Sequence, residues 1–204
     1  MEIEVKADGR RARGDESRAL VLHEAVNLAS VVGLHGLTFG SLALRTGRSK
    51  AGIQILFSNK EKLQLETVAF ARGMFADAVI RPALSTQRGL ARLKELFGNW
   101  IRYATEPLFE GGCFMVANLA EIDSLRGPLH DALFADHASW ISVLAGEIRF
   151  AVEAQEILDT DPEVAAFAVD AILCATNTSV RAGDANAIAR ARRALDIFLV
   201  PVGV

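Results

Sequence analysis

Apolar residues recur at spacings of three and four along most of this chain, and Gly or Pro interrupts the pattern at intervals. That period is typical of amphipathic helices, whereas strands would show an alternation with a period of two. Sustained alternation is absent from the sequence, and its β-branched residues are scattered. We therefore expect an all-α fold of about nine helices. Their predicted ranges are 15–32, 38–45, 49–57, 60–80, 86–105, 112–123, 128–155, 161–181 and 184–200.

Residue types suited to helix ends mark several of these boundaries. Thr38, Ser49 and Asn59 are predicted N-caps, because their side-chain oxygens can accept hydrogen bonds from the first free backbone N–H groups of a helix. The helix that begins at residue 60 is expected to end before Arg81-Pro82, since a proline disfavours helical backbone at the residue preceding it.

The composition favours a globular protein of the cytoplasm. Hydrophobic residues make up 51% of the 204 residues and charged residues 23%. No apolar run reaches the roughly 18 residues that a membrane span needs, so no membrane partner is expected. The charged N-terminus lacks the apolar stretch of a secretory signal. Cys113 and Cys174 have no disulfide or metal spacing, and we expect reduced thiols.

Charge is distributed unevenly along the chain. Residues 1–62 carry 10 Lys and Arg against 7 Asp and Glu, a net charge of +3, although the whole chain has a net charge of -3. The remaining residues therefore form an acidic body with a net charge of -6. A basic front on an acidic body indicates that only the front meets a polyanion.

Two predicted helices of about two turns follow each other closely between residues 37 and 63, with Gly47 at the bend. The spacing directs Leu42 of the first helix, and Ile53 and Phe57 of the second, toward a shared core. A helix-turn-helix motif has this form, in which the second helix is short enough to lie in the major groove of DNA. Any helical protein can also contain two short amphipathic helices with a glycine bend, so the spacing leaves both interpretations open.

Polar side chains of the second short helix lie on its predicted outer face. Gln54 can form a bidentate pair with adenine, and Ala51 can contact a thymine methyl group. Residues at the helix starts can contact phosphates, as can arginines on an arm before the first helix. The candidate DNA-binding residues are Arg10, Arg11, Thr38, Arg48, Ser49, Lys50, Ala51, Gln54 and Lys60.

Residues 18–63 resemble the DNA-binding domain of the TetR-like transcriptional regulators. The matching segments are "VLHEAVNLASVVG", "LTFGSLALRTG" and "SKAGIQILFSNKEKL". Downstream, "GGCFMVANLAEID" and "GPLHDAL" are similar to the ligand-binding part of one branch of that family. Two positions depart from the pattern: Gln54 stands where the family usually has an aromatic residue, and Arg48 where it commonly has an apolar one.

The resemblance implies a helix-turn-helix domain over residues 1–62 and a helical ligand-binding and dimerisation domain over 63–204. It implies a homodimer that pairs through its last two helices, binds a palindromic operator in double-stranded DNA, and releases it when a small, largely apolar effector binds. The same motif would also serve an activator. Broad apolar faces at 164–180 and 188–200 agree with such pairing, and they agree equally with an intrachain core.

Aromatic and polar residues of the middle helices are candidates for the effector site, because such sites are apolar cavities with a few polar groups. The candidates are Phe70, Met74, Trp100, Tyr103, Phe114, Asn118, Glu121, His137 and Trp140. Glu121 is the leading polar candidate, since a buried carboxylate needs a partner. Core packing is the alternative role for each aromatic residue, and a solvated helix end is the alternative for Glu121.

The sequence does not indicate an enzyme, a cofactor or a metal site. It has no Gly-rich phosphate loop, no Glu-x-x-His pair and no nucleophile–histidine set at a supporting spacing. His130 and His137 are seven residues apart, too far for easy chelation within one helix. The alternative to a regulator is a helical carrier that binds a small molecule and keeps the fold without specific DNA binding. The unusual Arg48 and Gln54 keep that alternative open.

Overall fold

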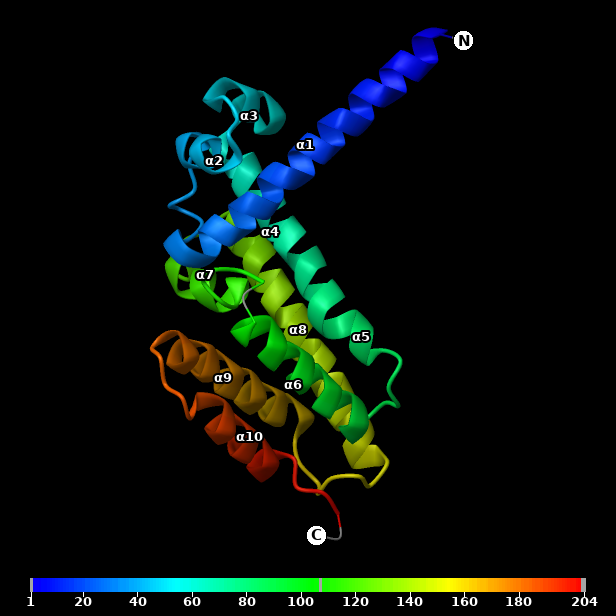
Figure 1. Cartoon of the computed structure of the whole chain (residues 1–204). Helices are drawn as coiled ribbons and strands as arrows, with labels where there is room; N and C mark the ends of the chain where they lie inside the picture. Colours follow the sequence, from blue (N-terminus) through cyan, green and yellow to red (C-terminus); the bar gives the residue numbers. More distant parts are fainter. Residues whose placement is uncertain (1, 107, 203–204) are drawn as a thin grey trace.

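The computed structural model describes residues 2–106 and 108–202, with side chains from residue 14 onward. These residues lie in helices or in irregular segments, apart from one backbone bridge between Ile157 and Pro201. The predicted all-α fold is therefore confirmed. The helices are α1 (Glu2–Val32), α2 (Phe39–Thr46), α3 (Lys50–Phe57), α4 (Lys60–Phe75), the π-helical η1 (Ala76–Ile80), α5 (Arg81–Ala83), α6 (Leu90–Thr105), α7 (Phe114–Ile122), α8 (Pro128–Glu153), α9 (Pro162–Arg181) and α10 (Ala187–Phe198). Helices α4, η1 and α5 follow one another without a break, so the described residues form nine continuous helices (Figure 1).

The first helix is longer than predicted, because α1 begins at Glu2 rather than at residue 15. Its first part is rich in Glu, Lys, Arg and Ala, which are good helix formers, and no proline interrupts it. Arg10 and Arg11 therefore lie on a helix and not on an extended arm. Their side chains are outside the part of the chain that the structure describes.

The helix that begins at Lys60 continues through Arg81-Pro82 instead of ending there. Hydrogen bonding changes from α to π register at Ala76, and the N–H of Arg81 donates to the carbonyl of Ala76, five residues back. Pro82 has no N–H, so it loses no hydrogen bond where the register changes. The helix ends at Ala83, one turn later than predicted.

Side-chain caps set the ends of the short helices in the N-terminal unit of α1, α2 and α3. The Thr38 hydroxyl accepts a hydrogen bond from the Ser41 N–H at 3.0 Å, and the Ser41 hydroxyl accepts one from the Thr38 N–H at 3.1 Å. Ser49 Oγ likewise accepts from the Gly52 N–H at 3.1 Å. Between the two helices Gly47 has a φ of 66°, in the left-handed region that ends α2. These are the caps and the bend that the sequence predicts.

The two short helices are anchored by fully buried side chains. Leu42 of α2, and Ile53 and Phe57 of α3, have no exposed surface, and they join Val21 and Ala25 of α1 in one apolar core. Burying an apolar side chain of this size stabilises the fold by about 1.5–3 kcal/mol. The inward faces predicted for both helices are confirmed, and the outward face of α3 is left free.

Helix α4 leads from the N-terminal unit into the body of the molecule (Figure 1). In the body α8 packs against α4 and α6, while α9 packs against α8 and α10. Figure 1 shows α9 and α10 side by side at the end of the molecule that is far from α2 and α3. The body therefore connects the N-terminal unit, through α4, to the last two helices.

Helix α9 is apolar on both sides. It is the one described helix that is long and apolar enough to cross a membrane by length and composition, a test that core helices of soluble proteins also pass. One side, which includes Val169 and Leu173, is buried against the neighbouring helices. The other side leaves Val164 62% exposed and Phe167 69% exposed. That second side is an unpartnered apolar face within this chain.

Helix α10 differs in part from the sequence interpretation. Ala191, Leu195 and Leu199 are buried within the chain, so this portion of the predicted pairing face belongs to the intrachain core. Ile197 and Phe198 remain exposed, at 72% and 44%. Sequence periodicity found the apolar residues of α10 but did not distinguish the two sides that they occupy.

Candidate functional site

The outer face of α3 combines polar and apolar side chains in solvent. Lys50, Ala51 and Gln54 are exposed, and Ile55 is 82% exposed. An amide, an ammonium and two apolar groups on one short helix are chemically suited to base edges, phosphates and thymine methyl groups in a major groove. The structure thus brings together three of the predicted DNA-binding residues on one surface.

The other predicted DNA-binding residues with described side chains are exposed near the ends of α2, α3 and α4. Arg48 is in solvent in the turn before α3, beside the capping residue Ser49. Thr38 is exposed at the start of α2. The Lys60 ammonium donates to the carbonyl of His35 at 2.6 Å, which holds it at the start of α4. Figure 1 places α2 and α3 together at one end of the molecule.

Arg18 of α1 fixes the position of α3, and the sequence reasoning missed it. Its Nη1 donates to the carbonyl of Leu56 at 2.8 Å, and its Nε donates to Glu66 of α4 at 2.7 Å. The guanidinium also lies 4.8 Å from the centroid of the Phe57 ring. One side chain therefore satisfies a carbonyl near the C-terminus of α3 and ties that helix to both α1 and α4. Its sequence signal was its place at the start of residues 18–63, the stretch that resembles the DNA-binding domain of the family.

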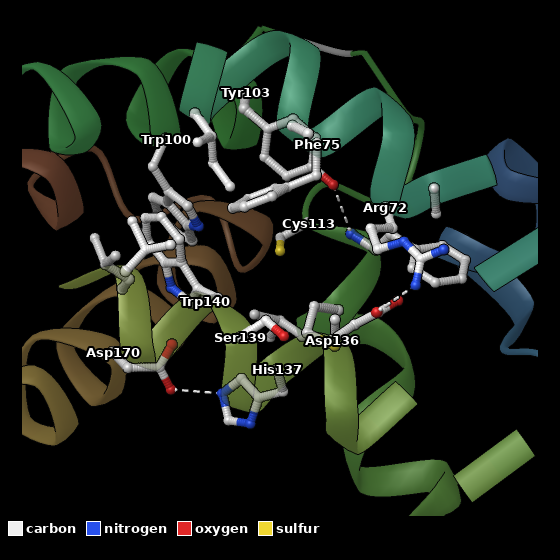
Figure 2. Close-up of a pocket in the computed structure, with 18 of the residues that line it drawn as sticks. Arg72, Phe75, Trp100, Tyr103, Cys113, Asp136, His137, Ser139, Trp140 and Asp170 are labelled. Carbon is white, nitrogen blue, oxygen red and sulfur yellow. Dashed lines mark hydrogen bonds and ion pairs between the residues drawn. The ribbon is translucent and has the colours of Figure 1, made fainter. Parts of the chain in front are cut away.

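A cavity of about 270 Å³ lies in the body, lined by residues of α4, η1, α6, α7, α8 and α9 (Figure 2). Most of its wall is apolar and aromatic. Phe75 of α4 packs edge-to-face against Tyr103 of α6 and Trp140 of α8, with ring centroids 5.3 Å and 5.2 Å apart. Edge-to-face pairs hold aromatic rings in a defined geometry. The cavity therefore has preformed walls of the kind that bind small organic molecules.

Two pairs of charged or titratable side chains also line the cavity. Arg72 Nη1 donates to Asp136 at 3.0 Å, and His137 Nε2 lies 2.8 Å from Asp170 Oδ2. Figure 2 shows the two pairs on different sides of the space, with Cys113 between them. Asp170 is also 3.9 Å from the sulfur of Cys174. The wall thus supplies a few fixed polar groups within an apolar surface.

Five of the nine predicted effector-site residues lie on the cavity wall, and four do not. The five on the wall are Trp100, Tyr103, Phe114, His137 and Trp140. Phe70 and Met74 are partly buried and pack against the core instead. Both residues lie on sides of α4 that do not face the cavity. The side of α4 that faces the cavity carries Val68, Ala71 and Phe75.

Asn118 and Glu121, the other two, point from α7 to the end of α1. Asn118 Oδ1 accepts from the Leu34 N–H at 2.8 Å, and its amide donates to the carbonyls of Ala29 and Phe114. Glu121 accepts from the N–H groups of Leu34 and His35 at 2.7 Å and 3.0 Å. These side chains join the body to the N-terminal unit. The partner that Glu121 requires is therefore backbone of the segment after α1.

Burial and the Asp170 carboxylate act on the thiols of the cavity. Burial raises the pKa of Cys113 to about 11, and the negative charge of Asp170 adds to this effect. Burial and Asp170 together raise the pKa of Cys174 to about 12. Burial likewise raises the pKa of Tyr103. Both thiols therefore stay protonated at neutral pH, and neither is an activated nucleophile.

Several cavity residues were not predicted, although helical spacing carried a signal for some of them. Ala71, Arg72 and Phe75 fall three and four residues apart on α4, as expected for one helix face. Asp136 and Asp170 gave no such signal, because the tertiary packing of α8 against α4 and α9 brings them to the cavity.

The His137–Asp170 pair could orient an imidazole as in nucleophilic catalysis, but the neighbouring hydroxyl is used elsewhere. Ser139 Oγ donates to the carbonyl of Ala135 at 2.8 Å, along its own helix. Among the described residues, no group of three His, Cys, Asp or Glu side chains could hold a metal ion. The geometry of this site is suited to binding a molecule.

Residues 89–195 match the family model of the C-terminal domain of tetracycline-repressor-like proteins. The matched segment is more than half of the chain and contains most of the cavity wall. The chain belongs to the TetR family. The resemblance found in residues 18–63 is thereby confirmed through the other part of the chain. A search of curated proteins finds no match.

Several solved structures share the fold of nearly the whole chain. A TetR-family regulator from Agrobacterium tumefaciens aligns with a TM-score of 0.80 and 21% identity, over 91% of this chain and 99% of that one. A transcriptional regulator from Saccharomonospora viridis, solved with choline, aligns with a TM-score of 0.77 and 20% identity, over 90% and 95%. AibR, solved with isovaleryl coenzyme A and operator DNA, aligns with a TM-score of 0.72 and 19% identity, over 89% and 97%.

Proposed function

We propose that this protein is a homodimeric transcriptional repressor that reads a palindromic DNA operator with α3 and leaves it when a small, largely apolar effector fills the cavity. The proposal assigns residues 1–62 to DNA binding, and residues 63–204 to effector binding and dimerisation. A non-enzymatic role in the cytoplasm is part of the same proposal, because reading chromosomal DNA requires the protein to be where the DNA is.

The observation that carries the proposal is that α3 is fixed to the core by buried side chains while its outer face is exposed to solvent. Ile53 and Phe57 fix the helix to the core while Lys50 and Gln54 stay in solvent. A two-turn helix held in this way can enter a major groove without losing its own packing. AibR, which shares the fold, was solved with operator DNA, and this supports the same use of the motif here.

Dimerisation through α9 and α10 is supported by the exposed apolar face. Val164, Phe167, Ala171 and Ala175 are exposed at helical spacing along α9, and Ile197 is exposed on α10. Apolar residues grouped on one face mark an interaction surface. A second copy of the same face would cover them around a two-fold axis, and it would place two α3 helices for the two half-sites of a palindrome.

Helix α4 provides the connection between cavity and DNA. It begins three residues after α3 ends, and its second half supplies Val68, Arg72 and Phe75 to the cavity wall. An effector that packs better against one position of α4 would shift the population toward that position and change the spacing of the two α3 helices. By linkage, operator DNA would weaken effector binding by the same factor.

Fluorescence anisotropy tests the DNA-binding part of the proposal. The duplex upstream of the protein's own coding region is compared with a scrambled duplex over a salt series. We expect the native duplex to bind about a thousandfold more tightly. Lys50→Ala should lower the slope of log affinity against log salt by about one, and Gln54→Ala should reduce the preference for the native duplex. Lys94→Ala, on the exposed side of α6, is the matched control.

The outcomes separate the regulator from a carrier. The wild-type protein could instead bind both duplexes equally and with a strong dependence on salt. This result would mean that residues 1–62 recognise only the phosphates of the native duplex and not its base sequence. Failure to bind either duplex at low salt, together with retained small-molecule binding, would favour the carrier. Transcription from the bound promoter, measured with and without the protein in vitro, distinguishes a repressor from an activator.

A further inference from the structure

Charge in the cavity is arranged with the carboxylates inside and the guanidinium outside. The side chains of Asp136 and Asp170 are only 9% and 13% exposed, whereas the Arg72 side chain is 63% exposed. Arg72 is already paired with Asp136 at 3.0 Å, so this ion pair balances itself at the edge of the cavity. Asp170 lies on the other side of the space in Figure 2, and among the described residues its ion-pair partner is His137 rather than an arginine or a lysine.

Asp170 retains capacity to accept a further hydrogen bond or a positive charge. Its contacts with His137, at 2.8 Å, and with Cys174, at 3.9 Å, are both made by Oδ2. No described residue donates to Oδ1. The His137 ring reaches Oδ2 and leaves Oδ1 open to a further partner. A carboxylate that is largely removed from water gains most from a partner that brings a full positive charge.

Aromatic rings line the same space. Phe75, Tyr103, Trp100 and Trp140 contribute to the wall, and three of these rings pack edge-to-face. Aromatic faces attract cations, and Trp does so most strongly. Aromatic walls with one carboxylate that has no arginine or lysine partner are a combination that recognises substituted ammonium groups with apolar bodies.

The Asp170 carboxylate disfavours a second negative charge in this cavity, and the neighbouring thiols respond to it. Burial is the main reason that the pKa of Cys113 is raised to about 11 and that of Cys174 to about 12, and Asp170 raises both further. Burial disfavours a ligand charge of either sign, whereas the Asp170 carboxylate disfavours only an anionic ligand. Among the described residues of the wall, the guanidinium that could balance an anion, that of Arg72, is already paired and mostly in solvent.

We propose that the effector of this cavity is a small organic monocation with an apolar body, an amine or quaternary ammonium compound, and that Asp170 is its counter-ion. This inference rests on the proposed effector function of the cavity and specifies its chemistry. The solved relatives do not decide the question, because one was crystallised with choline and another with isovaleryl coenzyme A. The side chains of this cavity are therefore the basis for the assignment.

Intrinsic tryptophan fluorescence gives a direct measurement of binding. The chain has two tryptophans, Trp100 and Trp140, and both line the cavity. The purified full-length protein is titrated with three probes of similar shape: phenyltrimethylammonium, its neutral isostere tert-butylbenzene, and the anion benzenesulfonate. We expect the cation to bind about tenfold or more tightly than the neutral probe, and the anion to bind most weakly.

Asp170→Asn keeps the shape of the side chain and removes its charge. In this variant the affinities for the cation and the neutral probe should agree within about threefold, while the neutral probe keeps its wild-type affinity. Asp196→Asn removes the same charge from the exposed surface of α10 and should leave the preference for the cation intact.

Three results would overturn the inference. These are equal affinities for the cation and the neutral probe in the wild-type protein, tightest binding by benzenesulfonate, and a preference for the cation that persists in Asp170→Asn. The wild-type comparison of probes needs no variant to fold. Operator binding without any probe is measured separately, so a failure of this inference leaves the DNA-binding proposal standing. A cation that binds tightly but does not release DNA would support the ligand class and contradict effector control.

Discussion

Asn118 Oδ1 accepts a hydrogen bond from the backbone N–H of Leu34 at 2.8 Å. This contact joins α7 to the segment that leads from α1 into α2. Phe114, in the first turn of the same α7, is on the cavity wall. One short helix therefore contacts the cavity at its start and the N-terminal unit one turn later. It is a second structural connection between effector site and DNA-binding unit, in addition to α4.

Asn118→Ala should destabilise the protein by about 3 kcal/mol, because it removes three buried hydrogen bonds at about 1 kcal/mol each. Asn118 is fully buried and bonds Leu34, Ala29 and Phe114. Urea unfolding followed by circular dichroism measures the change. Asn186→Ala, at an exposed position without a capping hydrogen bond, should stay within about 0.5 kcal/mol of wild type. Equal stability of both variants would show that the Asn118 contacts contribute nothing.

Gly111→Ala should destabilise the protein by about 3 kcal/mol, because the loop before α7 lies directly against α1. A Cβ at residue 111 would be 1.7 Å from the backbone oxygen of Ser30. Gly146 of α8 is the control, since a Cβ there meets nothing within 4 Å, and Gly146→Ala should stabilise the protein by about 0.5–1 kcal/mol. Thermal unfolding of the two variants should give shifts of opposite sign. A Gly111→Ala protein as stable as wild type would mean that α1 can move away from this loop.

The local structure could be predicted from sequence wherever one residue decides it. Thr38 and Ser49 cap helices because a hydroxyl oxygen reaches a free N–H of the next turn, and Gly47 ends α2 because a positive φ favours glycine. The helix end predicted before Arg81-Pro82 is wrong. The preference of a residue before proline for extended backbone is a local effect, and the π turn over residues 76–80 keeps the helix intact.

The cavity could be predicted only in part. Periodicity shows that Phe70, Trp100 and Trp140 belong to apolar helix faces, but not which of them borders an empty space. Asn118 and Glu121 show the same limit for polar residues. Their helix is apolar and a partner was expected for Glu121, but the backbone N–H groups of Leu34 and His35 that they contact belong to the segment after α1, which tertiary packing brings to α7.

The two cysteines should react slowly with alkylating agents in the folded protein. With pKa values of about 11 for Cys113 and about 12 for Cys174, roughly one thiol in a thousand or fewer is ionised at pH 8, against about a quarter of an unperturbed thiol. Iodoacetamide labelling followed by mass spectrometry should accelerate steadily between pH 8 and pH 10 and become fast on unfolding. Rapid labelling at pH 7 in the native state would contradict these pKa values.

The same thiols should make stability depend on pH above neutrality. The pKa of each is raised in the folded state relative to the unfolded chain, so the unfolded state loses protons first as the pH rises. Their contribution is therefore fully present below the ordinary thiol pKa of about 8.5 and is lost progressively above it. In urea unfolding, Cys113→Ala combined with Cys174→Ala should flatten the decline in unfolding free energy between pH 8 and pH 10. An unchanged slope would assign the decline to other groups.

Phe167→Glu should separate the proposed dimer without unfolding the monomer. Phe167 is 69% exposed on α9 between Val164 and Ala171, which are also exposed. In the monomer the new carboxylate would sit in water, so the structure of each chain should remain intact. In the dimer it would be buried against an apolar face, and an unpaired buried charge is strongly unfavourable. Sedimentation velocity should therefore show a dimer for the wild type and a monomer for the variant.

The loss of the dimer should also reduce DNA affinity, although residue 167 lies in α9, at the opposite end of the molecule from α3 (Figure 1). A monomer holds one α3 and can occupy one half-site, whereas a dimer binds both half-sites together and gains from their linkage. Leu84→Glu is the matched control, because Leu84 is 57% exposed away from α9 and α10, just after α5. It should leave both the dimer and the operator affinity unchanged. If Phe167→Glu stays dimeric, the exposed face of α9 is not the contact, and the two half-sites would have to be matched through another surface.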